Sequence, residues 1–145
     1  MLRGRGRILV ADRELFTLTL YRRRFWTTQW RRVDSWGIAI GKAGYRKELP
    51  RGVYTITGKS DCPDWQMPDA EWVPAHLRGT ILPCGHPENP IRARWLEIYE
   101  GAGIHGTLDR ASIGTAASHG CLRMLVEDVV ELYRQVPIGT PIVII

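Results

Sequence analysis

Apolar residues alternate with polar ones in several short runs of this chain, and this spacing constrains the fold more than any other feature. Leu15–Tyr21 alternates apolar residues with threonine, and Arg32–Ile40 places most of its apolar residues at every second position. Residues two apart lie on the same face of a strand, so each run predicts a strand with one buried face. Together with a third run, Arg7–Ala11, they predict a β-meander in the first third of the chain.

Later segments have the composition of further strands. Val53–Thr57 and Arg94–Tyr99 are rich in β-branched and aromatic residues, and Ile142–Ile145 is a closing apolar run. Ile104 and His105 follow a Gly-Ala-Gly turn. We expect these two residues at the end of a short strand, with His105 at a strand edge.

One segment near the C-terminus has helical spacing. Its apolar residues fall on one face of a helix of about three turns that stops at Pro137. They are Leu125, Val129, Leu132, Tyr133 and Val136. Residues 59–89, by contrast, contain five prolines and two cysteines without sustained periodicity. That composition predicts a long ordered loop, or flap, of the kind that often covers a site.

Length and composition predict a single soluble domain over residues 1–145. No window approaches the roughly 18 apolar residues that a membrane span needs, so we expect no stable membrane insertion. The basic N-terminus runs into an alternating segment rather than a continuous apolar one, so it does not resemble a signal peptide.

The net charge of +5 is carried mostly by arginine, with a dense patch at Arg22–Arg24 and Arg31–Arg32. Such a patch favours anionic surfaces, which include nucleic acid, anionic lipid and cell-wall polymers. Trp26 and Trp30 lie among these arginines, a combination also found where single-stranded nucleic acid stacks. We favour a simpler interpretation, a solvated strand pair with aromatic packing across the strands.

Cys121 stands in the run Ser118-His119-Gly120-Cys121, which is too polar and too rich in small residues to be simply core. A buried cysteine, a disulfide partner, a metal ligand and a nucleophile are the alternatives. We expect a helix just after Cys121, whose N-terminus would lower the thiol pKa. A nucleophile also needs a base, and His105 can approach it from another strand, whereas His119 is better suited to hydrogen bonding.

Gly120 permits a backbone conformation that aims N–H groups near Cys121 at a developing oxyanion. The residue types around Cys121 therefore predict an acyl-transfer site.

Several motifs at this point resemble the catalytic domain of the L,D-transpeptidases, the YkuD-like family. They are Ile104-His105-Gly106-Thr107, Ser112-Ile113-Gly114, and Ser118 to Met124, with supporting matches at Gly41-Lys42, Asn89-Pro90 and Gly139-Thr140-Pro141. The resemblance covers about residues 7–145. It implies a mostly β fold, a sandwich or flattened barrel, with one main C-terminal helix and a long flap loop over the catalytic cysteine.

The resemblance implies cleavage of the L-to-D bond in a peptidoglycan tetrapeptide stem, with loss of D-Ala and a thioester intermediate that an amine resolves into a 3→3 cross-link. Cys121 then resembles the nucleophile and His105 the base. The substrate-positioning and oxyanion neighbourhood corresponds to Gly106, Ser118, His119, Gly120 and Arg123. Carbapenem-type β-lactams are the expected inhibitors. No metal or organic cofactor is implied, nucleic acid is not an expected partner, and the location is extracytoplasmic.

Cys62 and Cys84 bracket the predicted flap and leave Cys121 as the odd one of three cysteines. A disulfide between them would stabilise the fold by roughly 3 kcal/mol in the chain-entropy model. Two unlinked thiols are the main alternative. Zinc bound with His76 and His86 is a weaker one, because the spacing fits no compact ligand pattern.

Two further functions stay open. Water in place of the amine would make the protein an L,D-carboxypeptidase with the same two catalytic residues. The arginine and tryptophan patch would suit a non-catalytic module that binds an anionic polymer, either cell-wall glycan or nucleic acid.

Overall fold

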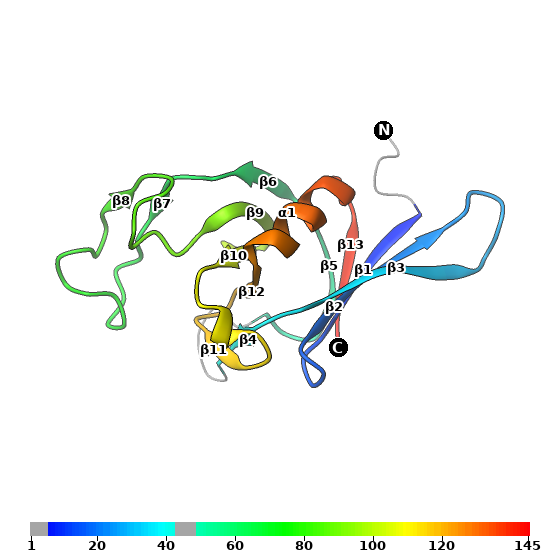
Figure 1. The fold of residues 1–145 in the computed structure, drawn as a ribbon, viewed down its shortest axis with the longest axis horizontal. Coiled ribbons are helices and arrows are strands. Elements are labelled where there is room, and N and C mark those ends of the chain that lie inside the picture. The colour runs from blue at the N-terminus through cyan, green and yellow to red at the C-terminus, as the bar shows by residue number, and fades with distance from the viewer. Residues whose placement is uncertain (1–5, 43–48) are drawn as a thin grey trace.

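The computed structural model describes residues 6–42 and 49–145, and this part of the chain is mostly β with a single α-helix (Figure 1). The strands are β1 (Arg7–Asp12), β2 (Thr17–Arg23), β3 (Trp30–Gly37), β4 (Ile40–Gly41), β5 (Gly52–Thr55), β6 (Gly58–Asp61), β7 (Trp65–Gln66), β8 (Ile81–Leu82), β9 (Arg92–Tyr99), β10 (Ala102–Thr107), β11 (Ala116–Ser118), β12 (Leu122–Leu125) and β13 (Pro141–Ile144). A short 3₁₀ helix spans Arg110–Ser112, and α1 spans Val126–Gln135.

The first sheet has five strands in the order β3-β2-β1-β13-β5. β1 and β2 form the expected antiparallel hairpin, and β13 pairs with β1 in parallel. The carboxylate of Asp12 closes the hairpin turn by accepting hydrogen bonds from the N–H groups of Glu14 and Leu15. Leu18 and Leu20 are buried, whereas Thr17, Thr19 and Tyr21, which alternate with them, are only partly buried. The alternation in the sequence therefore predicted the buried face correctly.

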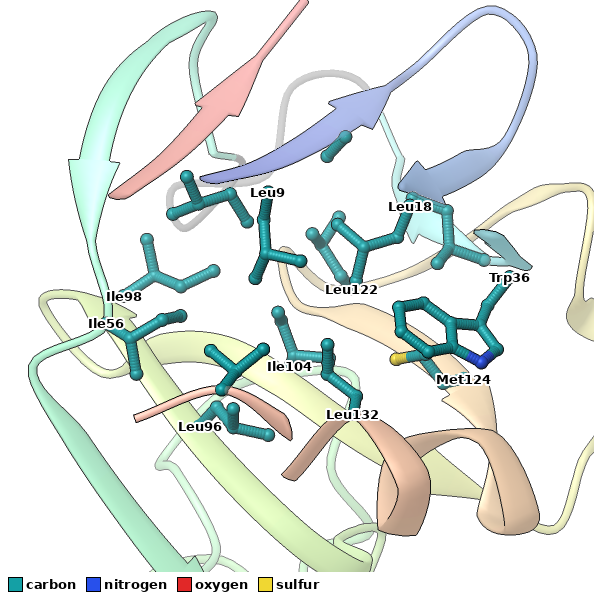
Figure 2. Packing of buried hydrophobic residues seen from close by; sticks show 14 of the residues in the cluster. Leu9, Leu18, Trp36, Ile56, Leu96, Ile98, Ile104, Leu122, Met124 and Leu132 are labelled. Atoms are coloured by element: carbon teal, nitrogen blue, oxygen red, sulfur yellow. The ribbon is translucent and has the colours of Figure 1, made fainter. Parts of the chain in front are cut away.

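The second sheet has four strands in the order β12-β10-β9-β6. Its inner face presents Leu96, Ile104 and Leu122 to the first sheet, and α1 adds Leu132 to the same core (Figure 2). Two sheets enclosing one apolar layer make a sandwich, and they do not close into a barrel. The mostly β fold expected from the resemblance is confirmed.

The predicted helix is also confirmed, within a residue of its expected ends. No side chain caps its N-terminus at Leu125, and Pro137 follows its C-terminus. Val129 and Leu132 are its buried residues, because they lie on the face that packs against β9 and β10.

The second sheet contains two departures from the sequence-based predictions. β6 lies where we expected only loop, because an edge strand of Gly, Lys, Ser and Asp shows no apolar alternation and is held by pairing with β9. His105 is not at a strand edge. It lies inside β10, a six-residue strand paired with β12 on one side and β9 on the other.

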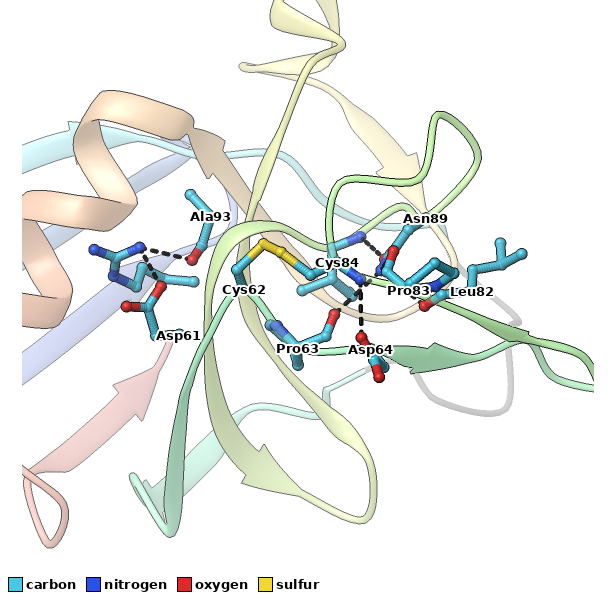
Figure 3. Close-up of a disulfide and its surroundings, with 11 residues drawn as sticks. Asp61, Cys62, Pro63, Asp64, Leu82, Pro83, Cys84, Asn89 and Ala93 are labelled. Carbon is cyan, nitrogen blue, oxygen red and sulfur yellow. Dashed lines mark hydrogen bonds and ion pairs between the residues drawn. A yellow bond between two sulfur atoms is a disulfide. The ribbon is translucent and has the colours of Figure 1, made fainter.

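The flap predicted at residues 59–89 corresponds in the structure to residues 62–91, between β6 and β9, and extends away from the sandwich (Figure 1). It has a small apolar cluster of its own, Met67, Val73 and Leu82. A disulfide joins Cys62 to Cys84, with Cα atoms 5.3 Å apart (Figure 3). Of the three alternatives for these cysteines, a disulfide, two unlinked thiols and a zinc site, the structure has the disulfide. The carboxylate of Asp64 accepts a hydrogen bond from the N–H of Cys84 at 2.9 Å.

Asn89 ties the two ends of the flap together. Its side-chain amide donates to the carbonyl oxygens of Pro63 and Leu82, and its side-chain oxygen accepts the N–H of Ile91 (Figure 3). Asn89 is buried, so these bonds replace the water that its amide would otherwise need. The flap is therefore a folded segment rather than an open loop.

Candidate active site

The pairing of β10 with β12 sets the place of His105 and Cys121. Ile104 lies opposite Leu122, and His105 lies opposite Arg123. Since Ile104 and Leu122 point into the core, His105 and Arg123 occupy the other face of the sheet. Cys121 stands immediately before β12 and is partly exposed. His105 thus lies on β10, and Cys121 directly precedes the neighbouring strand β12.

Cys121 is not at a helix N-terminus, contrary to our expectation. β12 separates it from α1, which begins only at Val126. The mistake arose because Leu122 and Met124 are too few to show a strand period before the helical spacing starts. A helix dipole therefore does not act on this thiol, since that effect fades within the first turn.

His105 is held as a neutral imidazole. Its side chain is 4% exposed, and its Nδ1 lies 2.7 Å from the carbonyl oxygen of Gly106. A carbonyl can only accept, so Nδ1 carries the hydrogen and Nε2 keeps a free lone pair. The pKa of His105 is lowered to about 4, mainly by burial; the Gly106 hydrogen bond opposes this shift and the charge of Arg123 adds to it. The ring is therefore a proton acceptor at neutral pH.

Aromatic rings shield this imidazole. Trp95 lies opposite His105 on β9, with ring centroids 6.2 Å apart, and Trp65 of the flap lies 4.8 Å from Trp95. Gly103 makes room for the indole, because a Cβ there would lie 3.0 Å from Trp95 ring atoms and 2.2 Å from the carbonyl oxygen of Leu96. This cover is a physical cause of the burial that lowers the pKa of His105.

The turn before Cys121 is fixed from two sides. Ser118 donates its hydroxyl hydrogen to the carbonyl oxygen of Cys121 and accepts the N–H of Gly120 at 3.3 Å. Gly120 has a φ of 128°, a region that other residues avoid. On the other side Gly41 of β4 approaches so closely that a Cβ on it would lie 2.9 Å from the Gly120 Cα.

His119 points to a different environment from His105. Its ring stacks on Trp72 of the flap, with centroids 3.9 Å apart and planes at 6°. Partial burial lowers the pKa of His119, and the positive charges of Arg123 and Lys42 lower it further. The two histidines therefore lie in different places: His105 is inside the sheet, and His119 is beneath the flap.

Arg123 and Gly106 occupy supporting positions. Arg123 exchanges two backbone hydrogen bonds with Ala39, and its guanidinium lies 3.9 Å from the carboxylate of Asp109. Gly106 is packed so tightly that a Cβ would lie 2.6 Å from the carbonyl oxygen of Arg92. Its observed contribution to the site is its carbonyl, which holds His105.

Residues 6–144 match the family described as the L,D-transpeptidase catalytic domain, YkuD. The chain belongs to this family. It is 33% identical over 118 residues to the putative L,D-transpeptidase YqjB of Bacillus subtilis, an alignment that covers 75% of this chain and 57% of that protein. The chain thus spans little more than half of the length of this relative.

Solved structures of L,D-transpeptidases share this fold. A structure from Mycobacterium smegmatis aligns with a TM-score of 0.70 at 20% identity, covering 97% of this chain and 58% of that one. L,D-transpeptidase 3 from Mycobacterium tuberculosis, in complex with a faropenem-derived adduct, aligns with a TM-score of 0.69 at 19% identity, covering 96% of this chain and 60% of that one.

Three residues of this L,D-transpeptidase domain contribute to the site geometry in ways that we did not predict: Gly41, Trp72 and Trp95. Trp95 was visible only as part of a strand, although its position opposite His105 follows from the pairing of β9 with β10. Trp72 had no signal at all, because nothing local in the flap sequence indicates which ring it meets.

Among residues 6–42 and 49–145, no three His, Cys, Asp or Glu side chains gather in a way that could hold a metal ion. Within the same ranges, no helix has both the length and the apolar composition needed to cross a bilayer.

Proposed function

We propose that this domain catalyses L,D-transpeptidation on peptidoglycan stem peptides, with Cys121 as the nucleophile and His105 as its general base. One observation carries the proposal: a buried His105 whose tautomer is set by the Gly106 carbonyl, on the strand next to the one that Cys121 precedes. Nucleophilic catalysis needs an imidazole that can accept the proton of a thiol, and the pairing of these strands supports that approach.

In the first half-reaction Nε2 of His105 takes the proton of the Cys121 thiol. The sulfur attacks the carbonyl carbon of the L-to-D bond in a tetrapeptide stem, and an oxyanion forms. When the C–N bond breaks, His105 returns the proton to the leaving amine of D-Ala. The stem is then held as a thioester on Cys121.

In the second half-reaction an amine on the third residue of another stem attacks the thioester carbon. His105 removes a proton from that amine, the C–S bond breaks, and the proton returns to the thiol. The thioester preserves the energy of the cleaved amide, so the 3→3 cross-link needs no nucleotide. Burial of His105 supports both steps because the low pKa keeps it unprotonated when it must accept.

The Ser118–Cys121 turn and Arg123 support the remaining assignments. The left-handed conformation of Gly120 orients the peptide groups that precede the nucleophile, which suits an oxyanion site. Arg123 supplies positive charge on the face of the sheet that carries His105. We assign substrate positioning to Arg123 and His119.

Two further properties follow from this proposal. A relative of the same fold was solved with a faropenem-derived adduct, so we expect penems and carbapenems to acylate Cys121. The Cys62–Cys84 disulfide fits an oxidising compartment, and peptidoglycan lies outside the cytoplasm, so we place the domain there.

Mass spectrometry of the products formed from a disaccharide-tetrapeptide tests the proposal, with Cys121→Ala as the comparison. A dimer lighter than two substrates by one D-Ala, absent with the variant, is the expected result. Tripeptide alone would replace the proposal with L,D-carboxypeptidase activity. No turnover by a protein shown to be folded would favour the non-catalytic binding module.

A further inference from the structure

The β2–β3 hairpin projects beyond the sandwich (Figure 1). Its tip, between Arg23 and Trp30, carries exposed aromatic residues. Phe25 is 99% exposed and Trp26 is 77% exposed. From the sequence we favoured aromatic packing across the strands by Trp26 and Trp30. Trp26 does not pack in this way, and Trp30 lies opposite Arg23 of β2. Folding leaves the rings of Phe25 and Trp26 in water, so nothing in the described structure accounts for their presence.

A row of like charges lies next to the tip of the same hairpin. Arg22 of β2 lies directly opposite Arg7 of β1 on one side and Arg31 of β3 on the other. Like charges that face each other across strands destabilise a sheet. Consistent with this crowding, burial and then the charge of Arg22 lower the pKa of Arg7.

The described part of the protein does not neutralise this row. The ion pairs that residues 6–42 and 49–145 form with one another involve Arg51, Arg94, Arg110, Arg123 and Arg134. None of them belongs to the hairpin. Instead, the guanidinium of Arg23 lies 5.3 Å from the Trp30 ring centroid, and a hollow of about 480 Å³ is lined by Arg22, Arg24, Arg31 and Arg32 among others.

We propose that this hairpin docks the domain on the surface of a bilayer that contains anionic phospholipids. The arginines meet the lipid phosphates, and Phe25 and Trp26 enter the boundary between headgroups and acyl chains. Arginine beside tryptophan at headgroup depth suits an interface that is anionic on one side and apolar on the other. This surface binding goes beyond the proposed function and does not depend on it.

The exposed aromatic rings favour a lipid surface over a soluble polyanion that carries phosphates alone. A phosphate polymer would be satisfied by the arginines, and it offers an exposed phenyl ring no apolar surface to enter. A bilayer removes that ring from water, which contributes binding energy in proportion to the apolar area buried. The hairpin and the flap extend in different directions from the sandwich (Figure 1), so docking leaves the candidate site open.

Co-flotation of the purified, oxidised chain with vesicles tests the proposal. One set of vesicles contains equimolar phosphatidylglycerol and phosphatidylcholine, and the other contains phosphatidylcholine alone. We expect partitioning into the anionic vesicles only, weakened by added salt. Partitioning into neither set, or equally into both, would overturn the proposal.

Variants separate the contribution of charge to vesicle binding from the contribution of the apolar side chains. Arg22→Gln and Arg31→Gln should each lower the partition coefficient about fivefold. Phe25→Ser with Trp26→Ser should lower it by at least a similar factor and abolish the blue shift of tryptophan fluorescence on binding. Arg134→Gln and Ile138→Ser, which change an exposed arginine and an exposed apolar residue elsewhere, are the matched controls.

A competition experiment distinguishes the lipid surface from a polyanion site. Soluble polyphosphate should displace the wild-type chain from bound anionic vesicles less effectively than competing anionic vesicles do at equal phosphate concentration. If polyphosphate competes equally, and the double aromatic variant binds vesicles as well as the wild type, the hairpin is a polyanion site and the membrane proposal fails. Circular dichroism of each variant confirms that folding is intact.

Discussion

The indole ring of Trp72 lies flat on the imidazole ring of His119, with centroids 3.9 Å apart and planes at 6°. This contact joins the flap to the motif that contains Cys121. Because His119 is only two residues before Cys121, the position of the flap and the position of the candidate nucleophile are mechanically connected.

Replacing Trp72 by alanine should therefore affect both the flap and the site. Loss of a stacked pair predicts acylation by a penem that is slower by about twofold to tenfold. The pKa of His119 should rise, because part of its burial is lost, while the charges of Arg123 and Lys42 remain. NMR titration of the histidines measures this rise. Trp30→Ala is the control, since Trp30 is 43% exposed and Trp72 is 42% exposed. An unchanged His119 pKa in Trp72→Ala would show that the stacking does not bury the His119 ring.

Removing the base should have a larger effect than removing the stacked histidine. His105→Gln removes the proton acceptor, so acylation near neutral pH should fall by about 10²-fold to 10⁴-fold. His119→Gln should reduce acylation less. Stopped-flow fluorescence with a carbapenem measures both rates, and equal losses would mean that the two histidines share the proton transfer.

Acid should destabilise the fold through His105. Burial lowers its pKa from 6.5 to about 4, so the unfolded chain binds a proton at pH values where the folded chain does not. The part of the free energy of unfolding that depends on neutral His105 is fully present above pH 6.5. It should fall as the pH drops toward 4, by as much as about 3 kcal/mol. Urea unfolding at several pH values measures this slope, which should be shallower in His105→Gln. A variant with the wild-type slope would assign the acid sensitivity to other groups.

The close approach of Gly41 to Gly120 predicts a sensitive position away from the catalytic residues. Gly41→Ala forces the backbone of β4 away from the Ser118–Cys121 turn and should cost about 1–3 kcal/mol of stability, with slower acylation of Cys121. Gly58→Ala is the matched control, because its Cβ would meet Glu97 only at an ordinary 3.6 Å. Thermal unfolding and penem labelling of both variants provide the comparison, and equal behaviour would contradict the steric argument.

The disulfide should contribute to stability without contributing to the chemistry. Cys62→Ser with Cys84→Ser opens a loop with a sequence separation of 22 and should lower the free energy of unfolding by roughly 3 kcal/mol. Guanidinium unfolding with and without reductant measures the loss. The double variant should be insensitive to reductant and should still be labelled at Cys121; loss of that labelling would give the bridge a role in shaping the site.

The parts of the fold that the sequence predicted are those with local periodicity. Leu18 and Leu20 show a strand face directly, and Val129 and Leu132 show a helix face. β10 was harder to predict, because Gly103 and Gly106 interrupt its apolar pattern and its burial comes from strands on both sides. β6 depends wholly on its partner β9.

The candidate site likewise combines residues that the local sequence predicts with contacts that it does not predict. Cys121 and His105 stand in motifs that can be recognised from their neighbours, and their catalytic roles stay predictions. The hydrogen bond from His105 to its neighbour's carbonyl was not foreseen, because it depends on the conformation of the strand end. The stacking of Trp72 on His119 depends on how residues 62–91 fold, and that fold is set by a disulfide, Asn89 and a small apolar cluster.

The flap is closed covalently at Cys62 and Cys84 and contains its own apolar cluster. Substitutions between these cysteines are therefore confined to a unit whose interior is separate from the main core. Such a unit is modular: under the proposed function, its surface can change to suit a different stem peptide while the sandwich that holds His105 keeps its packing. Differences in substrate preference between relatives of this domain should accordingly concentrate in this unit, where change has the least effect on folding.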